Sequence, residues 1–304
     1  MYGGDNRLWI IGHPAAPGDN ATTNSVTSAA WDGAAWSKPA DLTLNYYDPQ
    51  TARRIALNCV GAAVAGSTAG VVGCDPGGDI WAARSTVDLK DLISAVKPIW
   101  EPLEPVSDRN SADAPNDLPV VVTDKQGNLF TLWNQSTGAG DNETALYGAV
   151  QSNDRWSRST RLLRSPERAT GPRTAMQPSM AIDEQDRIHV VWSTGPNGPV
   201  AYSRVFARDF SGSTAWAAPT SLPAEMAASS RPDIAVDLAG KRLYVIYAKS
   251  FNEQRGIYLV RSPDGGSTWL TPTLVFDAAA AIWDSVDKPQ ICLLYTSPSP
   301  RDTR

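Results

Sequence analysis

A motif built around tryptophan recurs five times along the chain and constrains the fold more than any other feature. Each copy places a Trp before a short polar step, often a Pro, and then an aliphatic residue. Consecutive copies lie 53 to 64 residues apart, and they begin at Trp36, Trp100, Trp156, Trp216 and Trp269. A nearly constant period of this size indicates an array of similar structural units.

A second motif opens most of the units and has the pattern of a β-hairpin. Residues 117–133, 177–192 and 231–247 each contain an apolar stretch, a turn with Asp, and an alternating stretch that ends in an aromatic residue. Alternation on either side of a turn indicates two antiparallel strands. Third strands are expected at residues 79–85, 145–152, 199–205 and 256–262, and the Trp motif supplies the fourth.

Four strands per unit predict an all-β fold, namely a β-propeller of four-stranded antiparallel blades. Stacking the blades around an axis buries aromatic side chains between neighbouring sheets, which gives most of the 11 Trp residues a structural role. An array of β-sandwiches is the alternative, but its repeat would hold about seven strands in about 100 residues. The propeller is therefore the favoured fold.

The predicted domain organisation is a single propeller over residues 1–291. Five blades are recognisable, and the parent protein is expected to have six. The first blade is expected to lack its inner strand, and residues 288–291 match the opening of a sixth blade. Residues 292–304 are expected to be a non-native tail, because residues 292–302 resemble a translated sequencing adapter; a native Pro/Ser-rich tail is the alternative. The chain is thus interpreted as a fragment, incomplete at both ends.

The stretch SPDGGSTW at residues 262–269 looks like a site but has the composition of a turn. Asp264 is expected to accept hydrogen bonds from N–H groups of its own loop, and Gly266 allows a positive φ. Ser262 and Thr268 can join the two ends of the loop, and Trp269 can anchor it in the blade. We therefore predict a structural role between the third and fourth strands rather than a catalytic one.

This stretch resembles the Asp-box, S-x-D-x-G-x-T-W, that recurs in bacterial neuraminidases and the wider sialidase-like superfamily. Residues 31–36, 152–156 and 208–216 look like diverged copies at the same place in their blades. The resemblance spans about residues 6–291 and implies a sialidase-like propeller. It also implies that this loop lies on the face opposite the active site.

Candidate site residues are therefore sought in the loops of the other face, since function usually lies on loops of a rigid scaffold. Members of the sialidase family grip a substrate carboxylate with three arginines and use a Tyr nucleophile. The substrate-binding candidates are Arg54, Arg109, Arg173, Arg231, Tyr46, Tyr47 and Glu253. These residue types are equally ordinary on a solvated surface, and no catalytic residue can be assigned from their spacing.

Cys59 and Cys74 stand at equal distances from a turn at residues 65–68, so a tight hairpin would make them face each other. A cross-strand disulfide would suit an exported protein, extracellular or periplasmic. Two buried thiols in a reducing compartment are the alternative. The start of the chain does not have the pattern of a signal peptide.

Charge and composition exclude several classes of partner. The net charge is −5 and the chain has no basic run, so nucleic acid is not an expected partner. No stretch of 18 apolar residues predicts a membrane span. The chain has two His residues, His13 and His189, and no Cys or His spacing typical of a metal site, so neither a metal nor a cofactor is expected. His189 is predicted to be packed between blades.

Two functions remain open from the sequence. The favoured one is an exported, sialidase-like, monomeric propeller that binds glycans or another protein without chemistry of its own. The alternative is an exo-α-sialidase-like glycoside hydrolase whose last blade is missing. Since one fold hosts many functions, the fold cannot decide between them.

Overall fold

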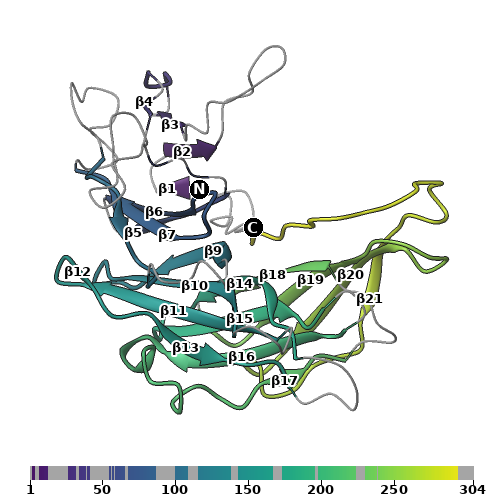
Figure 1. Cartoon of the computed structure of the whole chain (residues 1–304). Helices are drawn as coiled ribbons and strands as arrows, with labels where there is room; N and C mark the ends of the chain where they lie inside the picture. The colour runs from purple at the N-terminus through teal and green to yellow at the C-terminus, as the bar shows by residue number, and fades with distance from the viewer. Residues whose placement is uncertain are drawn as a thin grey trace, which may run out of the picture.

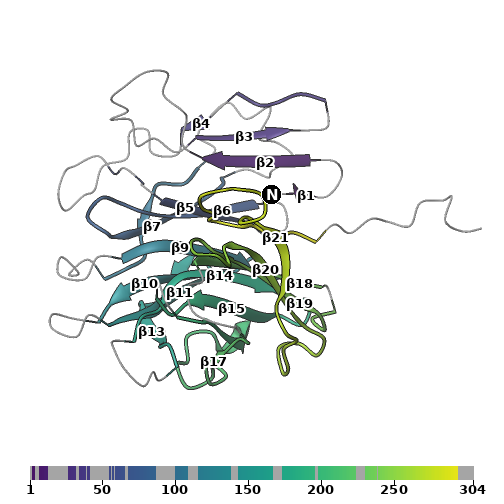
Figure 2. The same cartoon turned by 90° about the vertical axis from the view of Figure 1, so that its right-hand side faces the viewer.

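The protein is all-β in its computed structural model, and the residues that the structure describes form five antiparallel sheets that follow one another in chain order (Figures 1 and 2). Within the described residues, the only helical segment is a short 3-10 turn, η2 (Ala207–Asp209). The structure describes residues 2–3, 7–12, 27–31, 34–38, 40–41, 55, 57, 59–65, 68–86, 100–108, 116–137, 143–166, 173–195, 198–223, 230–237 and 239–293.

The first two sheets come from the first third of the chain, and we call them blades 1 and 2. Blade 1 has the strands β1 (Tyr2–Gly3), β2 (Arg7–Gly12), β3 (Thr27–Trp31) and β4 (Ala40–Asp41). Blade 2 has β5 (Cys59–Ala65), β6 (Thr68–Cys74), β7 (Ile80–Arg84) and β8 (Glu104–Pro105).

Blades 3, 4 and 5 repeat the same order of strands. Blade 3 has β9 (Asn116–Thr123), β10 (Leu129–Ser136) and β11 (Thr144–Ser152), with a fourth strand split into β12 (Arg155–Trp156) and β13 (Thr160–Leu163). Blade 4 has β14 (Met176–Ile182), β15 (Arg187–Ser193), β16 (Val200–Phe206) and β17 (Thr220–Ser221). Blade 5 has β18 (Ser230–Val236), β19 (Leu243–Lys249), β20 (Gly256–Ser262) and β21 (Thr273–Asp277).

The strand assignments made from the five repeats are confirmed; the corrections concern the two ends, since residues 288–291 form no strand and the first blade has one more strand than expected. The hairpins, third strands and Trp-led fourth strands all occur where the sequence predicts them. The first blade, however, has a short first strand, because Tyr2 pairs with Leu8 and Gly3 with Arg7. A strand of two residues is too short to show an alternating pattern, so it could not be recognised from the sequence.

Aromatic side chains pack between neighbouring blades, as the repeat predicts. Trp133, Trp192 and Tyr247 lie in the second halves of the second strands of blades 3, 4 and 5 and are almost completely buried. Trp133 belongs to the core shared with blade 2, Trp192 to the core between blades 3 and 4, and Tyr247 to the core between blades 4 and 5. Each large ring therefore joins two sheets, and burial of such rings dominates the packing energy of a core.

The first strands β5, β9, β14 and β18 are the innermost strands and contact one another in sequence. Thr123 of β9 donates a hydrogen bond from Oγ1 to the carbonyl of Val64 in β5, at 2.6 Å. Ser179 of β14 donates from Oγ to Oδ1 of Asp233 in β18, also at 2.6 Å. These contacts between blades place the four inner strands around a common axis.

Candidate functional site

Three of the inner strands bulge at the same place, where an X-Pro dipeptide enters the sheet. The pairing of β9, β14 and β18 with their neighbours shifts register around Pro119, Pro178 and Pro232. Proline has no N–H to donate to the ladder, so it is confined to edges, first residues and bulges. The repeated dipeptide therefore produces the same local distortion in successive blades.

The residue before the proline is strained at two of these positions and at a third X-Pro dipeptide, which follows blade 5. Gln177 has φ 53°, Arg231 has φ 41°, and Lys288, which precedes Pro289, has φ 53°. Residues other than Gly rarely adopt this left-handed region, and each costs on the order of 1–3 kcal/mol. Strain of this kind clusters at ligand sites, because the surrounding structure must hold a side chain in one direction.

These strained residues line a pocket at the axis, which we call the axial pocket. It has a volume of about 310 Å³ and is formed mainly by the inner strands and the segment that follows blade 5. Its lining comprises Cys59, Val60, Pro119, Val120, Gln177, Pro178, Ser179, Arg231, Pro232, Asp233, Lys288, Pro289 and Gln290. This volume is at the lower end of the range found for small-molecule sites, so the pocket suits a single small ligand or sugar unit.

Hydrogen bonds hold the polar groups of the axial pocket in place. The backbone N–H of Arg231 donates to Oε1 of Gln177 at 2.8 Å. Asp233 accepts from Ser179 at Oδ1 and from the backbone N–H of Ile291 at Oδ2, at 2.6 and 2.9 Å. Since both oxygens of its carboxylate are engaged, Asp233 organises the lining rather than offering a free acid or base.

The charges of the axial pocket favour an anionic group. Arg231 is half-buried and Lys288 is exposed, while Asp233 supplies the one negative charge of the lining. A guanidinium binds a carboxylate through two parallel hydrogen bonds, and such charge-assisted bonds are about twice as strong as neutral ones. The pocket can therefore hold the carboxylate of a small ligand beside Arg231.

The structure brings only one of the predicted site residues into this pocket. Arg231 lines it, whereas Arg173 lines a separate depression of about 480 Å³ beside Arg161 and Arg164. Glu253 is exposed in the turn between β19 and β20. The two described candidate arginines, Arg173 and Arg231, thus do not share a pocket. The remaining candidates lie outside the described residues: Arg54, Arg109, Tyr46 and Tyr47.

Sequence reasoning missed Gln177, Ser179, Asp233 and Lys288, although a signal for them was present. Each of them is adjacent to Pro178, Pro232 or Pro289, the prolines of three X-Pro dipeptides. Aligning the units on these prolines, rather than searching the loops for arginines, would have identified the lining. The segment that holds Lys288, expected to open a further strand, contacts β18 through Ile291 but has no strand assignment.

The Asp-box loop has the hydrogen bonds expected of a turn. Oδ1 of Asp264 accepts from the backbone N–H groups of Ser267 and Thr268 at 3.0 and 2.7 Å, and Oδ2 accepts from Thr268 Oγ1 at 2.7 Å. Ser262 Oγ donates to Asp264 Oδ1 at 2.9 Å. The bonds from Thr268 are the main reason why the pKa of Asp264 is lowered to about 2.

A buried polar network connects this loop with blade 4. Tyr202 lies beneath the loop, with its hydroxyl 2.8 Å from Nδ1 of His189, and Nε2 of His189 is 3.4 Å from the Asp183 carboxylate. Burial lowers the pKa of His189 and raises that of Tyr202. Burial also raises the pKa of Asp183, but hydrogen bonds from His189 and Arg187 outweigh it and bring the value to about 2. His189 is therefore packed between blades, as predicted, with hydrogen-bond partners on both nitrogens.

Cys59 and Cys74 are directly paired across the hairpin of β5 and β6, and the structure joins their sulfur atoms in a disulfide. Cys59 also contributes to the axial pocket. In the described part of the chain, no three His, Cys, Asp or Glu side chains gather as a metal-binding group. That part also contains no helix with the length and apolar character needed to cross a membrane.

Comparison with solved structures finds distant similarity. A protein of unknown function from Dyadobacter fermentans aligns at 10% identity and a TM-score of 0.50, over 84% of this chain and 74% of that one. An exo-β-1,3-galactanase from Clostridium thermocellum aligns at 14% identity with a TM-score of 0.47. An exo-1,5-α-L-arabinanase from a bovine ruminal metagenomic library aligns at 16% identity with a TM-score of 0.46.

The extent of the alignments differs between these two enzymes. The galactanase alignment covers 77% of this chain and 51% of the enzyme, so the chain spans about half the galactanase's length. The arabinanase alignment covers 76% of this chain and 78% of the enzyme. No protein-family model and no curated protein sequence matches the chain. At these identities the similarity concerns the fold alone.

Proposed function

We propose that the protein is an exported, sialidase-like propeller that binds glycans at its axial pocket, with Arg231 holding the carboxylate of an acidic sugar. The observation that carries the proposal is the cationic Arg231 beside Gln177 in a small, concave and polar lining. Both residues are held in strained backbone conformations, which is typical of groups that contact a ligand. Amide and guanidinium groups together bind sugar hydroxyls and a sugar carboxylate.

Binding without hydrolysis fits the lining better than catalysis. Most glycosidases need two carboxyl groups, and sialidases use a Tyr nucleophile. Among the residues that the structure describes, the lining of the axial pocket holds one carboxylate, that of Asp233, and no Tyr. Both oxygens of Asp233 accept hydrogen bonds from neighbouring groups, so that its carboxylate is not poised to move a proton.

A titration of the protein with sialyllactose and with lactose tests the proposal. We expect measurable binding of sialyllactose, weaker binding of lactose, and a loss of roughly 10- to 100-fold in sialyllactose affinity in Arg231→Ala, since a hydrogen bond to a charged group contributes about 1.5–3 kcal/mol. The exposed Arg158, which is not part of the lining, provides the matched control Arg158→Ala. Equal affinity in wild type and Arg231→Ala, or no binding at all, would contradict the axial site.

The alternative function, an exo-α-sialidase, is tested in the same samples with a fluorogenic sialoside. Tyr46 and Tyr47 are the Tyr residues of the sequence-predicted loops. Release of the fluorophore that is lost in Tyr46→Phe or Tyr47→Phe would assign the chain to the hydrolases. A binding propeller is expected to release none above background.

A further inference from the structure

The depression that Arg173 lines, which we call the rim groove, lies between the outer strand of blade 3 and the outer part of blade 4. It has a volume of about 480 Å³ and is bounded by β13, the residues that follow β13, and the segment between β16 and β17. Its lining includes Arg161, Arg164, Arg173, Ser213, Ala217 and Pro219. It shares no lining residue with the axial pocket.

The charges of the rim groove have one sign. Arg161, Arg164 and Arg173 contribute three guanidinium groups, and the described lining holds neither Asp nor Glu. Arg161 and Arg164 are exposed, and neither forms an ion pair within the part of the chain that the structure describes. The chain as a whole has a net charge of −5, so a local excess of positive charge favours an anionic ligand at this place in particular.

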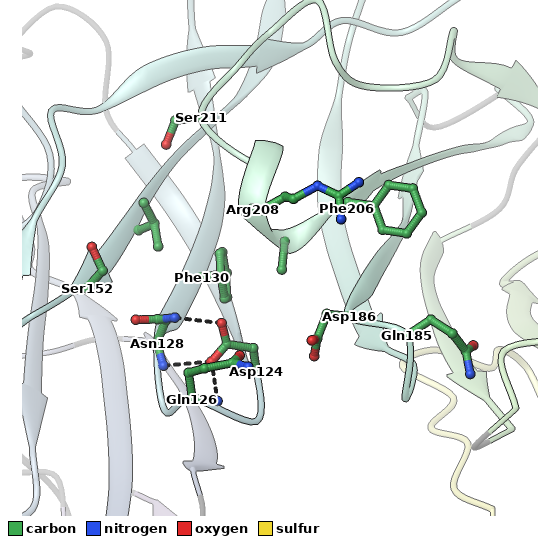
Figure 3. Close-up of a pocket in the computed structure, with 12 residues that line it drawn as sticks. Asp124, Gln126, Asn128, Phe130, Ser152, Gln185, Asp186, Phe206, Arg208 and Ser211 are labelled. Atoms are coloured by element: carbon green, nitrogen blue, oxygen red, sulfur yellow. Dashed lines mark hydrogen bonds between the residues drawn. The ribbon is translucent and has the colours of Figure 1, made fainter.

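A second pocket between blades 3 and 4, drawn in Figure 3, does not have this excess of positive charge. Its lining combines Arg208 with the carboxylates of Asp124 and Asp186. Arg208 is also paired outside the lining, since its Nε lies 3.4 Å from Oδ2 of Asp209. Of the two pockets, the rim groove is therefore the one whose arginines are available to an anion.

Hydrogen bonds hold the backbone that carries these arginines. Ser165, which follows Arg164, donates from Oγ to the carbonyl of Thr174 and accepts from Nε1 of Trp192 at 2.9 Å. The carbonyl of Arg173 accepts from the N–H of Thr144 at 3.1 Å. The backbone of the rim groove is thus fixed before a ligand binds, which lowers the entropic cost of binding.

The spacing of Arg161 and Arg164 suits a polymer that carries its charges far apart. Three residues of an extended strand span about 10 Å, which is close to the length of a disaccharide. An extended acidic peptide repeats its charges on one face every second residue, at about 7 Å. Guanidinium groups bind sulfate and carboxylate groups through paired N–H donors. The spacing therefore favours a polysaccharide with one anionic group per disaccharide.

The uncharged part of the lining also suits a sugar better than a nucleic acid. Ala217 is exposed and Pro219 is half-buried, so both offer apolar surface to the C–H groups of a sugar ring. The hydroxyl of the exposed Ser213 supplies a donor and an acceptor for a sugar hydroxyl. Nucleic-acid bases stack on aromatic side chains, and the aromatic ring of the described lining, that of Trp216, is buried.

We propose that the rim groove binds an acidic polysaccharide, with the guanidinium groups of Arg161 and Arg164 holding its sulfate or carboxylate groups. This site lies at the outer rim of blades 3 and 4, and its ligand is a polymer rather than a single sugar unit. The proposal does not rest on the axial pocket.

Calorimetry with a heparin-derived tetrasaccharide, which carries both sulfate and carboxylate groups, tests the proposal. We expect the wild-type protein to bind it, with an affinity that falls as the NaCl concentration is raised, because salt screens exposed charges. The double variant Arg161→Ala/Arg164→Ala is expected to lose about tenfold in affinity. Its Tm should stay close to that of the wild type, because both side chains are exposed.

Two control variants separate the rim groove from other sources of positive charge. Arg158 is an exposed arginine that precedes β13 and does not line the groove, and Arg231 lines the axial pocket. Arg158→Ala and Arg231→Ala should both keep the wild-type affinity for the tetrasaccharide. A loss confined to the double variant would support the proposal.

Several outcomes would overturn the proposal. They are a wild-type protein that does not bind the tetrasaccharide, full affinity in the double variant, and an equal loss in Arg158→Ala or Arg231→Ala. Hexaglutamate or an oligothymidylate of similar charge should bind more weakly than the tetrasaccharide. Equally tight binding of either one would overturn the assignment to a polysaccharide.

Discussion

Replacing Gly266 by Ala is expected to break the contact between the Asp-box loop and blade 4. Gly266 has φ 86°, and a Cβ built on it would lie 2.0 Å from Tyr202 Oη and 2.4 Å from Tyr202 Cζ. Contacts this short require either the loop or the Tyr202 ring to move. The ring is confined, since it is 3% exposed and packs edge-on against Trp269 with 4.9 Å between centroids.

The expected loss of stability follows from two contributions. An Ala residue in the left-handed region costs about 1–2 kcal/mol. Displacing the Tyr202 hydroxyl breaks its buried contact with His189 Nδ1, at 2.8 Å, and an unpaired buried group costs about 1–3 kcal/mol. The lower entropy of the unfolded chain with Ala returns about 0.4–1 kcal/mol. Gly266→Ala should therefore lower the free energy of unfolding by about 2–4 kcal/mol.

Urea denaturation followed by Trp fluorescence measures this loss, with Gly212→Ala as the matched control. Gly212 does not have a left-handed φ, and the nearest atom to its added Cβ is at 3.4 Å. The control should therefore change the free energy of unfolding by no more than about 0.5 kcal/mol. If Gly266→Ala were within about 1 kcal/mol of the control, the loop could not be clamped on Tyr202 as described.

Two further predictions concern titration and the cysteine pair. The pKa of His189 lies below its usual value of 6.5 because of burial, and that of Asp183 is about 2, below 3.8, so the unfolded chain binds more protons at both groups. Stability should therefore fall as the pH is lowered, first below about pH 6.5 because of His189 and again between about pH 4 and 2 because of Asp183. When Tm is measured against pH, His189→Gln should show a smaller decrease between pH 7 and 5 than the wild type. An equal decrease in both proteins would contradict the lowered pKa of His189. The native protein should titrate as one free thiol per chain, that of Cys292. Removing the Cys59–Cys74 bond, which spans 15 residues, should cost about 3 kcal/mol of stability, and three reactive thiols in the native protein would be incompatible with the bond.

The sequence by itself determined the strands, the number of recognisable units and the turn chemistry of residues 262–269. Such features depend on residues that are close together along the chain. Alternation of apolar and polar residues indicates a strand, and the recurring Trp motif marks each four-stranded unit. The pairing of Cys59 with Cys74 belongs to the same class, because the register of a tight hairpin follows from its own turn. Two ends are exceptions: β1 has too few residues to leave a pattern, and residues 288–291 resemble the opening of a blade but form no strand.

Only the tertiary structure decided which side chains share a pocket. Arg173 lies just before the first strand of blade 4 and Arg231 within the first strand of blade 5, and they line different depressions. Arg231 instead meets Gln177 and Lys288, because bulges at the X-Pro dipeptides and the stacking of blades around the axis set their directions. Contacts between blades join residues more than fifty positions apart, and no local pattern in the sequence encodes the distances between them.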